Sequence, residues 1–136
     1  MSRTSFILCE LRVALPATLQ AVEEFSVEFQ RRSRALLDKA NCFAAELLVR
    51  EALTNAVLHG SHGDPGKQVR CSLRLKGRCL LIAVEDQGAG FDWRAAWNRK
   101  AEFPDDSGRG IEILRKYADR VRFNQRGNVV AMIKRI

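Results

Sequence analysis

The sequence predicts an α+β fold: a two-layer α/β sandwich in which helices cover one face of a mostly antiparallel sheet. Residues 68–75 alternate cleanly between apolar and polar side chains, and a tight turn at 76–78 joins them to an almost wholly apolar run at 79–85. This pattern indicates a β-hairpin with one buried and one solvated face. Elsewhere apolar residues recur at helical spacing, so helices and strands are expected to share one core.

The N-terminal half is expected to form a strand and two helices. Residues 5–14 are apolar and compatible with a β-strand that ends at Pro16. Proline suits the first turn of a helix, and the segment that follows, to about Leu37, repeats apolar residues at helical spacing. Asn41 can cap the next helix, which runs to Gly60, where a turn-forming sequence closes it.

The C-terminal half is expected to add a helix and complete the sheet. Residues 91–107 lose periodicity and are expected to form a loop, which at this length is usually functional. Helical spacing resumes at 110–120, and residues 121–124 and 129–133 flank a turn-like stretch, as in a final hairpin. No repeat or linker interrupts this order, so residues 1–136 are expected to form a single domain.

The composition is that of a soluble globular protein. Of the 136 residues, 46% are hydrophobic and 29% are charged, and no apolar run approaches the ~18 residues that span a bilayer. No export signal is visible, so we expect a cytoplasmic protein with no membrane association. The cysteines lack paired spacing, which favours buried small side chains over a zinc or redox site: Cys9, Cys42, Cys71 and Cys79.

The formal net charge of +7 raises the question of nucleic-acid binding. The basic residues are dispersed, however, and their densest group, Arg31, Arg32 and Arg34, has no interleaved aromatic side chains that could stack on bases. A solvated basic face, or attraction to an acidic protein or a nucleotide, explains the charge better. We therefore expect no nucleic-acid partner.

The helix expected to end at Gly60 carries polar residues on its apolar side. At about 100° per residue, Glu51, Asn55 and His59 fall on one side of this helix. The same side carries four apolar residues: Ala44, Leu47, Leu48 and Leu58. Because a buried carboxylate or amide without a partner is costly, these polar groups either bond to each other and to neighbouring backbone, or meet a bound ligand or metal ion.

A carboxylate and two glycines follow the apolar strand of the first hairpin. Asp86 ends that strand, and Gly88 and Gly90 come directly after it. The carboxylate can accept hydrogen bonds from a flat, amino-bearing ring that lies against backbone without Cβ atoms. Taken alone, the same residues also fit an ordinary turn after a strand.

Gly108, Arg109 and Gly110 stand where the last helix is expected to begin. Free backbone N–H groups at a helix start can bind an anion, and an arginine adds two hydrogen bonds to phosphate. Taken alone, this stretch also fits a plain glycine-rich helix entry, and the chain contains no P-loop pattern.

In this order, the three stretches resemble the N-box, G1-box and G2-box of the GHKL ATPases, the superfamily of gyrase, histidine kinases and MutL. The residues that carry the resemblance are Glu51-Ala-x-x-Asn55-Ala-x-x-His59-Gly60, Asp86-x-Gly-x-Gly-Phe91 and Gly108-Arg-Gly-Ile111. Their wording is most similar to the anti-sigma-factor serine kinases of bacterial partner-switching modules, the RsbW and SpoIIAB type. The resemblance implies a Bergerat-type ATP-binding fold.

The resemblance also implies ATP and Mg²⁺ as cofactors. Asn55 would coordinate Mg²⁺ that bridges the ATP phosphates, and Asp86 would bind the adenine amino group, with Gly88 and Gly90 at the pocket edge. Glu51 would be the catalytic base that orients or deprotonates the attacking hydroxyl group. The chemistry of the residues agrees, because phosphoryl transfer needs a metal to offset charge and an acceptor for one proton.

Four further residues complete the implied site. Gly108, Arg109 and Gly110 would cradle the phosphates beneath a lid that runs from about Phe91 to Ser107, and His59 would line the pocket. One contact departs from the family, because the threonine that often follows the glycine of the last hairpin is absent here, and Asn128 is its expected substitute.

The lid is expected to be unusually aromatic, since it contains Trp93 and Trp97. These two side chains form either a patch for docking a protein or the hydrophobic underside of a partly ordered lid.

The function implied by the resemblance is that of an ATP-dependent protein-serine kinase. It would phosphorylate an antagonist protein with a STAS-type fold, hold a sigma factor or another target when unphosphorylated antagonist is scarce, and form a homodimer through its N-terminal strand and helix. The alternative is a non-catalytic switch that grips partners in an ATP-dependent manner. The ATPase half of a histidine kinase is disfavoured, because both histidines, His59 and His62, lie at or after the N-box.

Overall fold

The fold is built on one antiparallel sheet of five strands in the part of the chain that the computed structural model describes, residues 7–62, 64–90, 92, 95, 97 and 106–136. The strands lie in the order β1-β2-β3-β5-β4. Their bounds are β1 (Ile7–Pro16), β2 (Gln68–Lys76), β3 (Cys79–Asp86), β4 (Arg120–Phe123) and β5 (Val129–Arg135). Strand β3 is therefore central, and β1 and β4 are the edges.

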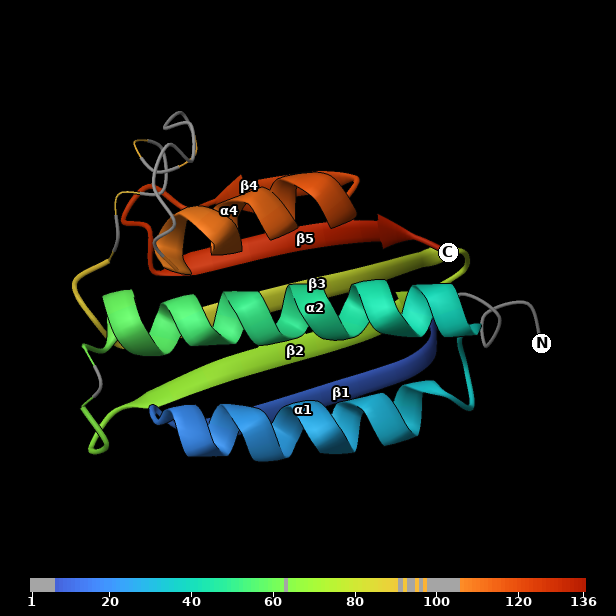
Figure 1. The fold of residues 1–136 in the computed structure, drawn as a ribbon, viewed down its shortest axis with the longest axis horizontal. Helices are drawn as coiled ribbons and strands as arrows, with labels where there is room; N and C mark the ends of the chain where they lie inside the picture. The colour runs from blue at the N-terminus through green and yellow to red at the C-terminus, as the bar shows by residue number, and fades with distance from the viewer. Residues whose placement is uncertain (1–6, 63, 91, 93–94, 96, 98–105) are drawn as a thin grey trace.

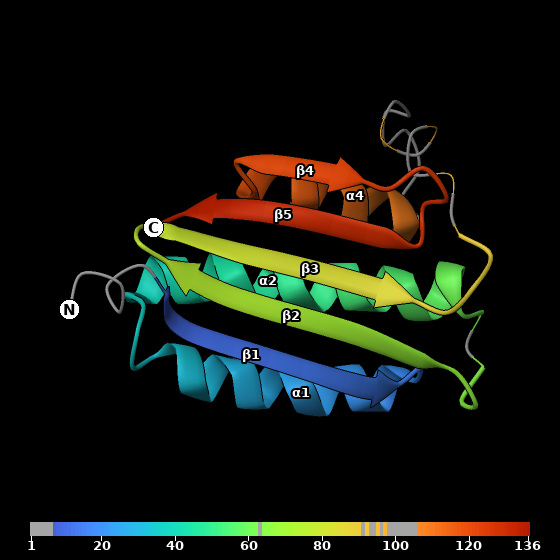
Figure 2. The same cartoon turned by 180° about the vertical axis from the view of Figure 1, so that it is seen from behind.

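The helices form a second layer on one face of this sheet (Figure 1). They are α1 (Leu19–Ser33), α2 (Lys39–Asn55), its π-helical continuation η2 (Ala56–Gly60) and α4 (Asp106–Tyr117). Seen from behind, the other face of the sheet is not covered by any of the helices named above (Figure 2). The expected two-layer α+β sandwich is confirmed. None of the described helices has the length and hydropathy that crossing a bilayer requires.

The core lies between the two layers and follows the predicted alternation. In β2 the odd-numbered residues Val69 to Leu75 are buried beneath the helices, and their even-numbered neighbours point away. The largest fully buried side chains come from both layers: Leu48, Leu53, Leu114, Ile82 and Met132. Burying each of them contributes about 1.5–3 kcal/mol.

Two of the cysteines are buried, as expected. Cys42 lies within α2, and Cys71 lies within β2. Burial raises the pKa of the Cys71 thiol to about 12, so this thiol stays protonated and behaves as a small apolar side chain. Cys79 is partly exposed.

The start of α1 differs from the prediction. Pro16 is the last residue of edge strand β1, a position where proline is tolerated, and does not begin the helix. Thr18 is the N-cap instead, and its Oγ1 accepts a hydrogen bond from the N–H of Ala21 at 3.1 Å.

The start of α2 also differs by three residues. Asn41 lies inside the helix, and Asp38 is the N-cap, with its side chain accepting a hydrogen bond from the N–H of Asn41 at 2.8 Å. An aspartate at this position also meets the positive end of the helix dipole, which an asparagine does not exploit as fully.

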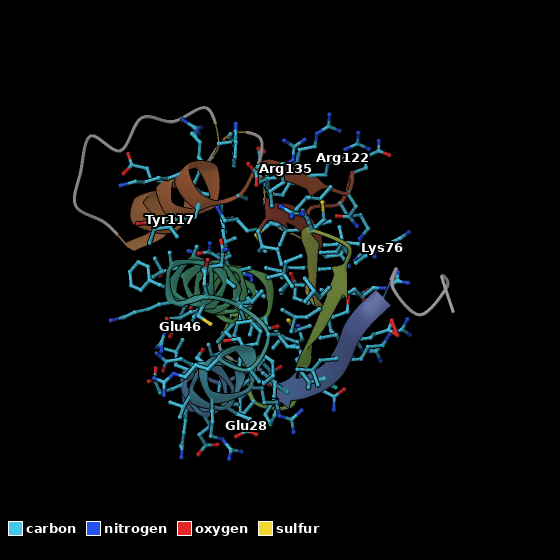
Figure 3. All side chains as sticks on the ribbon, turned by 90° about the vertical axis from the view of Figure 1, so that its right-hand side faces the viewer. Glu28, Glu46, Lys76, Tyr117, Arg122 and Arg135 are labelled. Atoms are coloured by element: carbon cyan, nitrogen blue, oxygen red, sulfur yellow. The ribbon has the colours of Figure 1, made fainter. Side chains whose placement is uncertain are left out.

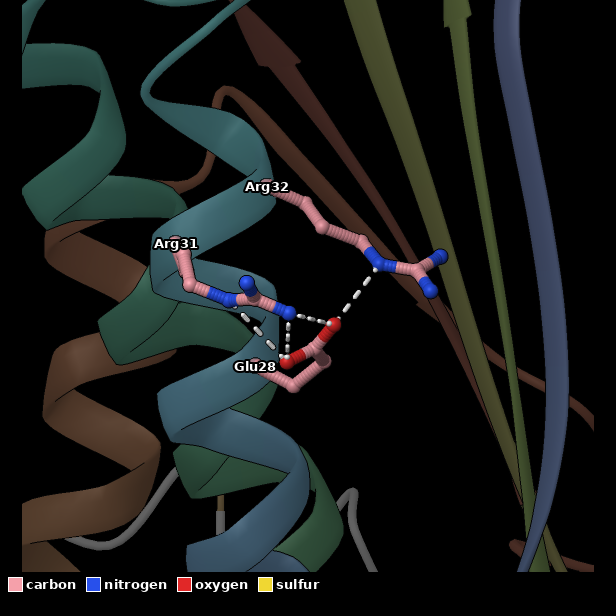
Figure 4. A network of polar contacts seen from close by, with 3 residues as sticks. All are labelled: Glu28, Arg31 and Arg32. Carbon is pink, nitrogen blue, oxygen red and sulfur yellow. Dashed lines mark hydrogen bonds and ion pairs between the residues drawn. The ribbon is translucent and has the colours of Figure 1, made fainter.

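The outer surface of α1 is held by ion pairs (Figure 4). Arg31 donates to the carboxylate of Glu28 from Nη2, at 2.7 Å to each oxygen, and from Nε at 3.3 Å, and the Nε of Arg32 donates a further hydrogen bond at 3.0 Å. Hydrogen bonds from Arg31 and Arg32 hold the pKa of Glu28 below its usual value. The densest basic group in the sequence is thus partly neutralised by its own helix.

The region between β3 and α4 was expected to be a loop over 91–107, and most of it lies outside the described residues. Helix α4 begins at Asp106, so the last two residues of that stretch are helical. Trp97 packs edge-on against Phe123, with ring centroids 5.9 Å apart, and the guanidinium of Arg115 lies 4.6 Å from its ring centre. Trp97 therefore packs internally, and Trp93 lies outside the described residues.

Candidate functional site

The candidate site is built around the end of α2, where the helix changes its winding. Glu51 and Asn55 lie in the last two turns of the α-helix, and Ala56–Gly60 continues as a π-helix. The N–H of Ser61 donates to the carbonyl of Ala56 at 2.8 Å, five residues back. Single π-turns of this kind occur frequently at functional sites.

The π-turn changes which side chains face the core. Leu58 was expected on the buried side and is 39% exposed, because the wider turn shifts the helical phase after Asn55. His59 and Glu51 remain partly buried, and Asn55 is almost completely buried at 4% exposure.

The Nδ2 of Asn55 is a buried donor that lacks a hydrogen-bond partner among the described residues, and so does the hydroxyl of Ser61, directly after η2. A buried amide left unpaired costs about 1–3 kcal/mol, so a native fold keeps one only for a reason. Because the oxygen and nitrogen of an amide can exchange places by a flip, Asn55 can present either atom to a ligand.

Asp86 stands at the end of central strand β3 and is 5% exposed. Its Oδ1 accepts a hydrogen bond from the N–H of Gly88 at 2.7 Å. Burial raises the pKa of this carboxyl above its ordinary value, and the hydrogen bond from Gly88 partly offsets the effect. The charge of neighbouring Glu85 raises it further.

Gly60 and Gly88 bring the end of the helix onto the end of the strand. A Cβ built on Gly60 would lie 2.2 Å from both Cγ and Oδ2 of Asp86, and one built on Gly88 would lie 1.6 Å from the carbonyl oxygen of Gly60. Only backbone without side chains fits at this crossing. The two glycines thus bring Asp86 against Gly60, the last residue of the π-turn that follows Asn55.

The turn between β4 and β5 contacts the glycine-containing segment after β3 on the side away from the helix end. Gly90 has φ +106°, and a Cβ there would lie 1.9 Å from the carbonyl oxygen of Arg126. The guanidinium of Arg126 donates to the carbonyl of Gly88 at 3.2 Å. Residues 88–90 are therefore held between the helix end and the last hairpin.

Asn128, the expected substitute for the family threonine, bonds to the backbone of Asp86 through both its main chain and its side chain. The N–H of Asp86 donates to the carbonyl of Asn128 at 2.9 Å, and Nδ2 of Asn128 donates to the carbonyl of Asp86 at 3.4 Å. Nδ2 of Asn124 in turn donates to Oδ1 of Asn128 at 2.6 Å. Asn128 thus fixes the backbone that carries the buried carboxylate.

Gly108, Arg109 and Gly110 lie within the first turns of α4, which begins earlier than expected. Figure 1 shows the start of α4 at the same end of the molecule as the end of α2 and the end of β3. The three stretches singled out in the sequence are thus gathered at one end of the sandwich.

Sequence reasoning missed three contributors to this site. Gly60 was interpreted as the end of a helix and as the last residue of the N-box, but its close approach to the side chain of Asp86 was not predicted. Arg126 was interpreted only as part of a turn, and Asn124 only as the last residue of the strand before it. Gly60, directly after His59, was a visible signal, but the contacts of Arg126 depend on tertiary packing.

Comparison with known proteins agrees with this geometry. The family described as "Histidine kinase-like ATPase domain" matches residues 13–134. A protein named "Anti-sigma F factor" from Anoxybacillus flavithermus is 29% identical over 97 residues, covering 65% of this chain and 66% of that protein. Another of the same name from Shouchella clausii is 31% identical over 80 residues, covering 55% and 54%. The matches thus span about half to two-thirds of these relatives.

A solved structure shares the fold. It is a "Histidine kinase domain from Erythrobacter litoralis EL346 blue-light activated histidine kinase", with a TM-score of 0.51 and 19% identity, covering 88% of this chain and 61% of that one. The family match covers nearly the whole chain and implies ATP binding. The chain therefore belongs to the Histidine kinase-like ATPase domain family.

Proposed function

We propose that this protein is an ATP- and Mg²⁺-dependent protein-serine kinase of the anti-sigma type. In the cytoplasm it phosphorylates a STAS-type antagonist, and it holds a sigma factor or another regulatory target when unphosphorylated antagonist is scarce. It acts as a homodimer. The relatives named "Anti-sigma F factor" support the biological role, and the residues at the end of α2 support the chemistry.

The observation that carries the proposal is the buried, unpartnered amide of Asn55 next to the crossing of Gly60 and Asp86. A fold that gained nothing from a ligand here would replace this amide with an apolar side chain. Mg²⁺ usually keeps several waters and takes only one or two protein ligands, so one amide oxygen suffices. When bound, the ion neutralises charge on the phosphates of ATP.

Each remaining residue has a defined part in the proposal. Asp86 accepts a hydrogen bond from the amino group of adenine, and Gly88 and Gly90, which have no side chains, form the pocket edge. His59 lines the pocket. The start of α4, with Gly108, Arg109 and Gly110, binds the phosphates through backbone N–H groups and the guanidinium.

Glu51 is the proposed base of the transfer step. The hydroxyl oxygen of the antagonist serine attacks the γ-phosphorus of ATP, the bond to the β,γ-bridging oxygen breaks, and ADP leaves. The carboxylate of Glu51 accepts the proton that the serine loses. Its position one turn before Asn55 on α2 brings the acceptor and the metal ligand side by side.

Replacing Glu51 with alanine is expected to leave ATP binding intact and to slow transfer by about 100-fold or more, the contribution of a positioned base. The assay uses labelled ATP, Mg²⁺ and candidate antagonist proteins encoded by neighbouring genes. Glu24→Ala, which removes an exposed carboxylate from α1, is the matched control. Transfer by Glu51→Ala at the wild-type rate would refute Glu51 as the base, and absence of transfer by the wild type itself would leave the non-catalytic ATP-dependent switch.

Replacing Asn55 with alanine is expected to abolish Mg²⁺-dependent ATP binding without lowering the stability of the ligand-free protein by more than about 1 kcal/mol. The lost side chain leaves a small cavity, but an unpaired buried amide disappears with it. Titration calorimetry with and without Mg²⁺ measures the first effect, and urea denaturation the second. Unchanged affinity for Mg²⁺-ATP would show that Asn55 holds no metal.

A further inference from the structure

The sheet face opposite the helices, called the outer face here, carries an unusual charge pattern. Its outward side chains come from alternate positions of the strands, and no described helix covers them (Figure 2). Seven of those side chains are basic: Arg12, Arg70, Arg74, Lys76, Arg120, Arg122 and Arg135. Figure 3 shows Lys76, Arg122 and Arg135 on this side, with Glu28, Glu46 and Tyr117 on the helical side.

The strand register sorts six of the seven basic residues into two flanks, and Arg135 lies at the end of β5. On one side lie the outward residues of β1 and β2, and on the other those of β4, where Arg120 pairs with Ile133 and Arg122 with Ala131. Only two outward carboxylates oppose them on the described strands, Glu10 and Glu85. Glu10 is already paired, since it lies 3.3 Å from both Arg12 and Arg74.

Between the flanks runs an apolar stripe on the two central strands. Its outward residues are Leu81 and Ala83 from β3 and Val129, Ala131 and Ile133 from β5. Leu81 pairs with Ile133, and Ala83 with Ala131, so the stripe is continuous across both strands. The small alanines keep its centre low relative to the long arginine side chains on either side.

A surface depression of about 490 Å³ lies on the same face. Arg12 and Arg70 stand at its rim, and Ala14, Ala83 and Val129 are among the residues that line it. Glu85 and Ser72 line the depression as well, so the outer face holds a shallow and largely apolar hollow beside the basic flank of β1 and β2.

We propose that the outer face binds an amphipathic helix with acidic flanks from another protein. Three strand spacings separate β2 from β4, about 14 Å, and a helix with its side chains is about 10–12 Å wide. The apolar side of such a helix covers the central stripe, and its carboxylates accept hydrogen bonds from the arginines of both flanks. This inference does not rest on the proposed kinase function.

The charge pattern excludes a second copy of the same face as the occupant. Two outer faces in contact would bring fourteen basic side chains together with only four carboxylates, and half of those carboxylates are paired within their own copy. Burying so many unpaired charges of one sign is strongly unfavourable. Complementarity requires a partner with the opposite charge.

Nucleic acid is also a poor match. Proteins that bind single strands on a sheet stack the bases on aromatic side chains, and no described outward strand position of this face carries one. The aromatic residue of β4, Phe123, points to the other side, where it packs against Trp97. The side chains of the apolar stripe cannot donate hydrogen bonds to phosphates, but they can pack against the apolar side of a helix.

The probe for this proposal is a fluorescein-labelled 18-residue peptide with leucines along one helical side and glutamates on both flanks. Fluorescence anisotropy compares it with a scrambled peptide of the same composition. The wild-type protein is expected to prefer the amphipathic peptide by about 10-fold, and Arg120→Glu/Arg122→Glu is expected to weaken its binding by about 10-fold. Ala131→Gln fills the stripe without changing charge and should also weaken binding.

The control is Arg34→Glu/Lys39→Glu, which makes the same charge change in the helical layer at exposed positions and should bind as the wild type does. Equal affinity for the scrambled peptide, undiminished binding by either outer-face variant, or no binding below about 1 mM would overturn the proposal. Tighter binding of a (dT)20 oligonucleotide to the same arginines would assign the face to nucleic acid. Loss of a wild-type dimer in the outer-face variants, seen by sedimentation velocity, would assign it to self-association.

Discussion

Replacing Gly88 with alanine is expected to destabilise the protein by at least about 3 kcal/mol, the upper end of the range for overpacking, and to abolish ATP binding. The new Cβ would lie 1.6 Å from the carbonyl oxygen of Gly60, which is backbone and cannot rotate away. The end of the α2–η2 helix must then separate from β3. Urea denaturation measures the loss as a lower midpoint at an unchanged slope.

Gly66→Ala is the matched control for this substitution. A Cβ at Gly66 would meet only the Oδ1 of Asp64, at 3.2 Å, and that exposed side chain can move. We expect its midpoint to stay close to that of the wild type. A Gly88→Ala midpoint equal to that of Gly66→Ala would mean that the helix and strand do not meet as tightly as the structure indicates.

The main elements of the fold could be predicted because they depend on local patterns. The β2–β3 hairpin followed from alternation over 68–75 and an apolar run at 79–85, and both strands formed within one or two residues of those bounds. Helix starts were less predictable, because several polar residues compete to cap. Thr18 and Asp38 have the extended backbone of an N-cap residue, whereas Pro16 belongs to β1 and Asn41 lies inside α2.

Part of the candidate site could also be predicted from local sequence patterns. Asp86, Gly88 and Gly90 stood out as a carboxylate and glycines after a buried strand, and the structure brings them to the helix end. The π-turn after Asn55 could not be predicted, because the spacing of apolar residues does not indicate a wider turn. Leu58 was therefore assigned to the buried side, whereas it is exposed.

The two most buried polar groups of the site carry an energetic cost in the ligand-free protein. The Nδ2 of Asn55 has no hydrogen-bond partner among the described residues, and the carboxylate of Asp86 is desolvated. Both groups lie where the helix end meets the sheet, and both weaken the fold unless something binds them. Stability given up at a binding site is regained when the ligand supplies the missing contacts.

Replacing Asp86 with asparagine tests this trade-off directly and is expected to change stability and binding in opposite directions. The amide keeps an oxygen that accepts the N–H of Gly88 but removes the buried charge, so the ligand-free variant should be more stable at neutral pH. ATP affinity should fall by about 10- to 100-fold, because a hydrogen bond to a charged acceptor is lost.

The difference in unfolding free energy between Asp86→Asn and the wild type is expected to depend on pH. Because burial raises the pKa of Asp86 in the folded state, the folded wild type binds more protons than the unfolded chain between the ordinary aspartate value of about 3.9 and the raised one. Wild-type stability therefore falls as pH rises through this window, whereas asparagine does not titrate. The advantage of Asp86→Asn should vanish below the window and be complete above it. An Asp86→Asn protein that is less stable than the wild type at pH 7 would mean that the carboxylate stabilises the ligand-free fold, and the cost assigned to it would then be wrong.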